Sequence, residues 1–166
     1  MRFHAEHRFP APVGAVAALL LDPEFHRRLE LPDLRLLEVV DDDTGADGGG
    51  SGSRLGLRYD FVGHLDPLAS KLLAGRRLTW VQELRLDPSR GVGRLSFEAE
   101  AAPDRLHGAA DMVLEPVDGG ALRRLDGELV VAVPLMGRRA EGRIVPGLLR
   151  RLDIEAAALA ERLRAT

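Results

Sequence analysis

Four side chains in the sequence have the types and spacing expected of groups that point into a small-molecule site. They are His7, Tyr59, Trp80 and Gln82, and each falls in an alternating segment at the parity of the apolar residues. An apolar wall with a few convergent polar groups is the usual composition of such a site. In that role Tyr59 and Gln82 would orient a ligand, and Tyr59 or His7 could act as an acid or a base.

Each of these side chains also has a purely structural interpretation. Tyr59 and Trp80 can be core residues with a satisfied hydroxyl and N–H. Gln82 is the only glutamine in the chain, and it needs a hydrogen-bond partner if it is buried. His7 lies near the end of its segment, which favours a histidine of the rim or the core over a catalytic base.

Familiar motifs of metal binding and catalysis are not found in the sequence. His4 and His7 stand three residues apart in a strand-like segment, so they point to opposite faces and cannot share a metal. The absence of cysteine excludes disulfides, thiolate nucleophiles and cysteine-ligated zinc. Neither the acidic segment 41–47 nor the segment 48–52 has the spacing of a calcium or phosphate loop. We therefore assign no catalytic residue, no metal and no cofactor.

Charge and hydropathy exclude several classes of partner. The net charge is -3, so no global basic field attracts nucleic acid. The longest apolar runs, Ala15–Leu21 and Leu129–Met136, are far short of a membrane span, and the N-terminus lacks the apolar run of a signal peptide. We expect a cytoplasmic protein with no nucleic-acid partner and no membrane span, and we assign no oligomeric state.

Arginine carries nearly all of the positive charge and is concentrated near the C-terminus. The charged residues there are Arg138, Arg139, Glu141, Arg143, Arg150, Arg151, Asp153, Glu155 and Glu161. Because both signs are interspersed, we interpret this stripe as a solvated helix face.

Hydrophobic periodicity predicts the elements that position these residues. Residues 2–9 alternate as a strand, and two short helices follow, one over Val13–Leu21 and one from Asp22-Pro23-Glu24 to Pro32. Six further strands are predicted at 34–40, 55–61, 78–86, 94–101, 106–114 and 121–133. The segment 41–53 is expected to be a hairpin loop, and 67–74 a linker that could form a helical turn.

The C-terminal segment has a different period. Apolar residues recur at spacings of three and four from Ile144 to Leu163, which predicts a long amphipathic helix, kinked or restarted at Pro146-Gly147. The chain has 166 residues, and we expect one domain over residues 1–166.

Small residues gather on the apolar face of three predicted strands. If the turns are centred near Pro103-Asp104 and Asp118-Gly119, Ala99 pairs with Gly108, and Ala110 pairs with Gly127. The volume left free there suits either a ligand or a closely packed helix, or the glycines serve sheet curvature alone. A β-bulge in these strands would reverse the parity.

The order of elements leads to a family resemblance. The opening AEHRFPAPVGAVAALLLDPEF resembles the start of START-like (SRPBCC, Bet v 1-like) proteins. The segments LTWVQELRLD and GELVVAVPLMGRRAEG and the amphipathic tail resemble an actinobacterial branch, the domain of unknown function 2505 family. The likeness covers essentially the whole chain, and Pro146-Gly147 departs from the unbroken helix that it implies.

This resemblance implies a fold and a cavity, but no particular reaction. The fold is α+β, a helix-grip: a seven-stranded antiparallel curved sheet wrapped around a long C-terminal helix, with two short helices after the first strand. Members of the wider superfamily carry lipids, sterols, polyketides and plant hormones, and some branches are cyclases or hydroxylase subunits.

The leading hypothesis is therefore a protein that binds a hydrophobic small molecule, lipid-like or polyketide-like, in an internal cavity. The candidate lining residues are His7, Leu57, Tyr59, Trp80, Gln82, Phe97, Ala99, Gly108, Ala110, Met112, Gly127 and Leu152. Two alternatives stay open. One is a small cofactor-free cyclase or dehydratase, and the other is a protein-interaction or regulatory module with a filled core.

Overall fold

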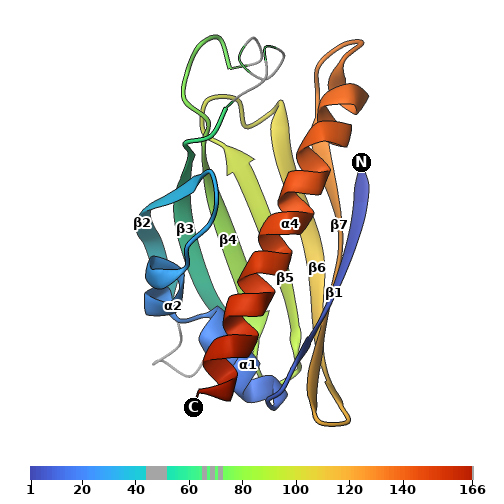
Figure 1. The fold of residues 1–166 in the computed structure, drawn as a ribbon. Coiled ribbons are helices and arrows are strands. Elements are labelled where there is room, and N and C mark those ends of the chain that lie inside the picture. Colours follow the sequence, from blue (N-terminus) through green and yellow to red (C-terminus); the bar gives the residue numbers. More distant parts are fainter. Residues whose placement is uncertain (44–51, 65–66, 68–69, 71–72, 166) are drawn as a thin grey trace.

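A computed structural model describes residues 1–43, 52–64, 67, 70 and 73–165. Its main feature is one antiparallel sheet of seven strands in the order β1-β7-β6-β5-β4-β3-β2. The sheet curves around the helix α4, and α1 and α2 lie at the end where α4 finishes (Figure 1). The elements are β1 Arg2–Phe9, α1 Val13–Leu20, α2 Pro23–Arg28, β2 Leu34–Asp43, β3 Ser53–Phe61, β4 Thr79–Asp87, β5 Val92–Ala99, β6 Leu106–Val117, β7 Gly120–Val131 and α4 Gly137–Arg164.

The predicted fold class and element order are confirmed. The helix α2 begins as expected, because the Asp22 side chain accepts a hydrogen bond of 2.9 Å from the Glu24 amide and Pro23 opens the first turn. In the part of the chain that the structure describes, no helix is long and apolar enough to cross a membrane.

The predicted boundary between the second strand and the following loop needs correction. The strand β2 continues to Asp43, so residues 41–43 belong to a strand and not to the expected loop. The register of β2 with β3 shifts between Leu36 and Glu38 and again between Val39 and Asp41. These irregularities interrupt the period-two alternation along β2, so the sequence pattern does not mark where the strand ends. Residues 44–51 of the expected loop, and residues 68–69 and 71–72 of the expected linker at 67–74, lie outside the described residues.

The predicted pairing of small residues was right for one pair and wrong for the other. Ala110 pairs with Gly127 as expected, but the partner of Gly108 is Phe97, two residues before Ala99. The parity survives because a shift of two keeps every side chain on its face. Neighbouring rings use much of the freed volume: a Cβ on Gly108 would lie 2.4 Å from Phe97 Cζ, and one on Gly127 would lie 2.6 Å from Phe3 Cζ.

Of the two outcomes expected at Pro146, a kink or a restart, the restart was wrong, because α4 is one helix of 28 residues with Pro146 inside it; the kink stays a prediction. Pro146 and Gly142, four residues earlier, are both exposed. The carbonyl that proline leaves without an amide partner is therefore on the solvated side, while Val145 and Leu152 hold the opposite face in the core. Burial of that face keeps the helix continuous where local propensity opposes it.

Candidate functional site

A cluster of polar side chains is buried between the sheet and α4. Its central members are Gln82 on β4, Arg123 on β7, and Arg151 and Glu155 on α4, and His26 on α2 lies at its margin. Arg123 is only 1% exposed and is the largest fully buried side chain. Burying charges is costly unless they are paired, so these residues need partners inside the protein.

Arg123 is the best-satisfied member of the cluster. It donates a hydrogen bond of 2.7 Å to Glu155 Oε1 and a longer one of 3.4 Å to the Leu152 carbonyl. Its Nη2 also lies 3.2 Å from His7 Nδ1, and its guanidinium lies 5.6 Å from the centre of the Phe9 ring. Because arginine can only donate, Nδ1 of His7 is the acceptor.

His7 connects this cluster to the surface. Its Nε2 lies 3.0 Å from Asp153 Oδ1, and Asp153 is exposed. With Nδ1 accepting, the ring proton is on Nε2 and is donated to Asp153. Burial, followed by the charge of Arg123, lowers the pKa of His7 from 6.5, so the ring is neutral at pH 7. Both of its nitrogens are engaged, which disfavours a free catalytic base.

Arg151 is less well satisfied than Arg123. One of its amino groups, Nη1, donates to Gln82 Oε1, which supplies the partner that a buried Gln82 requires. Its guanidinium lies 4.8 Å from the centre of the Tyr59 ring, and Tyr59 in turn stacks on Trp80 with ring centres 5.7 Å apart. Nε and Nη2 of Arg151 have no hydrogen-bond partner among the described residues, and the same is true of the Tyr59 hydroxyl.

The electrostatics of the cluster leave it with an excess positive charge. Although burial alone would raise it, the pKa of Glu155 is lowered by Arg123, Arg151 and His26, so this carboxylate is ionised at pH 7. Burial lowers the pKa of His26 from 6.5, which keeps that ring neutral. Two guanidinium groups therefore face one carboxylate.

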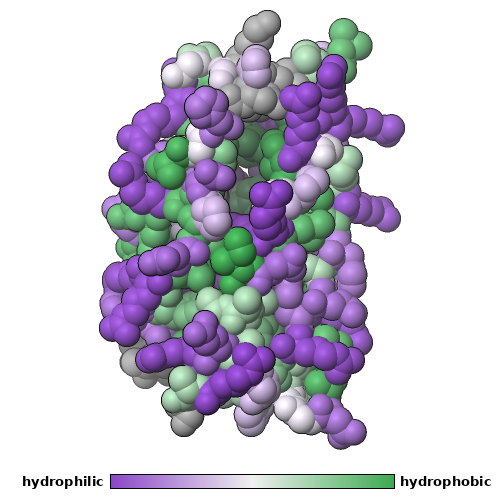
Figure 2. Space-filling model, viewed as in Figure 1, coloured by the Kyte–Doolittle hydropathy of each residue, from purple (hydrophilic) through white to green (hydrophobic). Residues whose placement is uncertain are grey.

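The structure has a small cavity beside the cluster and a hollow on its surface (Figure 2). A small cavity of about 10 Å³ is lined in part by His26, Gln82, Arg123 and Glu155, and a space of this size holds about one water molecule. Figure 2 shows a wider hollow beside the first turns of α4, with hydrophobic atoms in its walls and hydrophilic residues around it.

A set of large apolar side chains packs against the core and is only partly buried. They are Leu78, Trp80, Phe97, Ile144, Leu148 and Leu149. Trp80 pairs with Ala99, and Phe97 pairs with Gln82, so both rings stand on the inner face of neighbouring strands. Leu148 lies on α4 one turn before Arg151 and Leu152, on the same helix face. Partly buried apolar side chains thus adjoin the Tyr59–Arg151 pair, Trp80 next to Tyr59 and Leu148 one helical turn from Arg151.

The sequence-predicted lining residues all lie on the inner face of the sheet or helix. Buried among them are Leu57, Tyr59, Gln82, Ala99, Gly108, Ala110, Met112 and Leu152, whereas His7, Trp80, Phe97 and Gly127 are half-buried. The structure brings Tyr59, Trp80 and Gln82 together around Arg151. Ala110 and Gly127 instead pack beside the Phe3 ring. Contact of this set with a ligand stays a prediction.

Sequence reasoning missed Arg123, Arg151, Glu155 and His26. The interpretation of the C-terminal charges as a solvated face was wrong for Arg151 and Glu155, which are buried, and right for Arg143 and Arg150, which are exposed. Their spacing could have indicated that they are buried. Arg151 and Glu155 follow Leu148 by three and seven residues, so they lie on the same face of the helix as Leu148. Arg123 likewise has the parity of Leu125 and Gly127.

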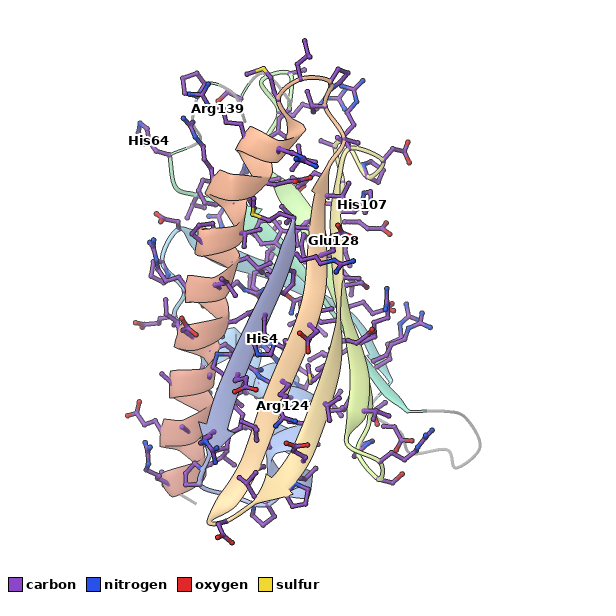
Figure 3. The ribbon with its side chains drawn as sticks, turned by 90° about the vertical axis from the view of Figure 1, so that its right-hand side faces the viewer. His4, His64, His107, Arg124, Glu128 and Arg139 are labelled. Carbon is purple, nitrogen blue, oxygen red and sulfur yellow. The ribbon has the colours of Figure 1, made fainter. Side chains whose placement is uncertain are left out.

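Surface groups do not extend the site. His4 and His7 lie on opposite faces of β1, as alternation predicts: His4 contacts Asp126 on the outer face at 2.7 Å (Figure 3). Among the described residues no group of three His, Asp or Glu side chains could hold a metal ion. A groove of about 620 Å³ lies at the far end of the sheet between residues 10–14, the turn 88–91 and residues 119–120. None of the buried polar residues described above lines it.

Comparison with solved structures shows the same fold in several proteins. TTHA0849 from Thermus thermophilus is 20% identical with a TM-score of 0.68, covering 99% of this chain and 98% of that chain. The ZhuI aromatase/cyclase from Streptomyces sp. R1128 is 18% identical with a TM-score of 0.56, covering 99% and 94%. A Thalictrum flavum norcoclaurine synthase point mutant, in complex with a transition-state analogue, is 16% identical with a TM-score of 0.62, covering 99% and 94%. At these identities the likeness shows the fold, a START/Bet v 1-like helix-grip, and not an activity.

Comparison by sequence identifies the family. Among curated proteins there is no match. The family model described as "Protein of unknown function (DUF2505)" matches residues 4–163, nearly the whole chain. The protein therefore belongs to the DUF2505 family, within the START-like fold group.

Proposed function

We propose that the protein binds a hydrophobic small molecule, lipid-like or polyketide-like, in the hollow between α4 and the inner face of β4 and β5. The observation that carries the proposal is the partial exposure of Trp80, Phe97, Ile144 and Leu148 on faces that otherwise form the core. Large apolar side chains left partly open on a concave face are typical of ligand sites.

The volume of the interior supports the hollow as the site in preference to an enclosed cavity. The cavity beside the polar cluster measures about 10 Å³, whereas a pocket for a drug-sized ligand measures on the order of 300 Å³ or more. A ligand would therefore lie on Trp80 and Phe97, with the cluster as the floor of the site. Covering roughly 200 Å² of apolar surface would contribute about 5 kcal/mol before the entropic cost of binding.

The polar groups favour binding over catalysis. Burial raises the pKa of Tyr59, so its phenol stays protonated and can donate a hydrogen bond but cannot act as a base. His7 already donates to Asp153 and accepts from Arg123. A cyclase or dehydratase would need one of these groups to be released for proton transfer.

The test is native mass spectrometry of the purified protein, followed by titration with a neutral hydrophobic fluorophore such as N-phenyl-1-naphthylamine. We expect a co-purified hydrophobe or saturable binding of the fluorophore. Leu148→Asp should abolish binding because it puts a charge into the wall, while Ala157→Asp, at an exposed position of the same helix, should not change it. If neither a co-purified molecule nor saturable binding is found, the proposal is wrong.

A further inference from the structure

The excess positive charge of the buried cluster lies at Arg151. Glu155 makes its direct ion pair with Arg123 at 2.7 Å. No carboxylate in the described part of the chain lies within ion-pair distance, 4.0 Å, of Arg151, although this arginine is only 7% exposed. A buried guanidinium without a counter-ion is unfavourable, so this position favours an anion from outside the chain.

The geometry of the free donors specifies the kind of anion. Nε and Nη2 are the two atoms of Arg151 without a partner among the described residues, and they lie on one edge of the guanidinium plane. The two oxygens of a carboxylate match this edge with two parallel hydrogen bonds. Since Nη1 is held by Gln82, the guanidinium is fixed, and the Nε and Nη2 edge is buried without a hydrogen-bond partner among the described residues.

Tyr59 provides a third donor at the same place. Its hydroxyl is buried next to Arg151, with which it interacts, and makes no hydrogen bond of normal geometry in the described part of the chain. The Tyr59 ring lies under the Arg151 guanidinium at 4.8 Å. The other neighbour of the Tyr59 ring is Trp80, which is half-buried. The charged and apolar parts of the site are therefore adjacent.

We infer that the bound molecule is an apolar carboxylic acid, whose carboxylate pairs with Nε and Nη2 of Arg151 and the Tyr59 hydroxyl while its apolar part covers Trp80 and Phe97. The inference rests on the proposed function and narrows it to one ligand class. The cluster has one positive charge in excess, which a monoanion neutralises. A phosphate dianion would leave the site negative, and a neutral carbonyl would leave Arg151 without a counter-ion.

The test uses dodecanoic acid, with methyl dodecanoate and dodecanol as neutral probes of the same chain length. Trp80 is the only tryptophan, so its fluorescence reports binding at the hollow. We expect the wild-type protein to bind the acid at pH 7.5 at least about tenfold more tightly than either neutral probe, as a charge-assisted bidentate contact implies. Arg151→Gln should remove this preference by weakening the binding of the acid.

Controls separate the charge from the fold. Arg150→Gln removes the same charge at the neighbouring exposed position and should keep the full preference. Arg151→Lys keeps the charge but not the bidentate edge, and Tyr59→Phe removes one donor; each should reduce the preference only in part. These two variants also carry the test if Arg151→Gln does not fold, as judged by circular dichroism.

The outcomes distinguish the two proposals. Equal affinity for acid, ester and alcohol in the wild-type protein would overturn the carboxylate inference and leave the proposed function standing. A preference for the acid that survives Arg151→Gln would also overturn it. If none of the three probes binds, the proposed function itself fails, and the inference with it.

Discussion

Replacing Glu155 by glutamine should destabilise the protein strongly, because Glu155 is the buried carboxylate that faces two buried arginines. Its side chain and that of Arg123 are 6% and 1% exposed and lie 2.7 Å apart. Removing one partner of a buried ion pair costs about 3–5 kcal/mol, a large part of the roughly 5–15 kcal/mol that stabilises a domain. With a urea m-value of about 2 kcal/mol/M, the unfolding midpoint should fall by about 1.5–2.5 M.

The assay is urea unfolding followed by circular dichroism at pH 7, with Glu161→Gln as the control on the same helix. Glu161 is exposed, so its variant should stay within about 0.5 kcal/mol of the wild type. A loss below about 1 kcal/mol in Glu155→Gln would refute the buried ion pair. The difference in unfolding free energy between the wild type and Glu155→Gln should also shrink in acid. The pKa of Glu155 is lowered from 4.5 in the fold, so the stability that the ionised carboxylate contributes is present above pH 4.5 and is lost as the pH falls through the folded pKa.

Other single positions give further tests. Stability should fall as the pH drops below 6.5, because burial lowers the pKa of His26 and the unfolded chain then binds more protons than the folded one. In urea titrations at several pH values, His26→Gln should reduce this dependence of the unfolding free energy on pH. An unchanged dependence would count against a buried neutral His26. Gly127→Ala should cost about 1–3 kcal/mol, since its Cβ would lie 2.6 Å from the Ala109 carbonyl oxygen, whereas Gly147→Ala, with nothing within 4 Å, should be neutral or stabilising by up to about 1 kcal/mol. Pro146→Ala should raise the melting temperature, because it restores a helical hydrogen bond at an exposed position; a lower melting temperature would show that Pro146 has a packing role.

Much of the fold could be predicted because period-two and period-3.6 patterns report which face of each element is buried. The strand β1 and the Asp22 cap of α2 follow from a few neighbouring residues. The continuity of α4 could not be predicted in this way. It depends on burial of Val145 and Leu152 against the sheet, which outweighs the local effect of Pro146.

The candidate site could be predicted only in its apolar part. The inward positions of Tyr59, Trp80 and Gln82 follow from strand parity, which needs no knowledge of partners. Arg123 and Glu155 lie 32 residues apart in the chain, and charged residues are seldom buried unless paired. Their burial depends on a pairing between β7 and α4 that no local pattern reports.

A crystal structure of the protein with dodecanoic acid would test the central claim most directly. We predict the carboxylate within hydrogen-bond distance of Arg151 Nε and Nη2, with the hydrocarbon chain over Trp80 and Phe97 beside α4. Density for the acid in the groove between residues 10–14 and 88–91, or no bound acid at saturating concentration, would contradict this prediction.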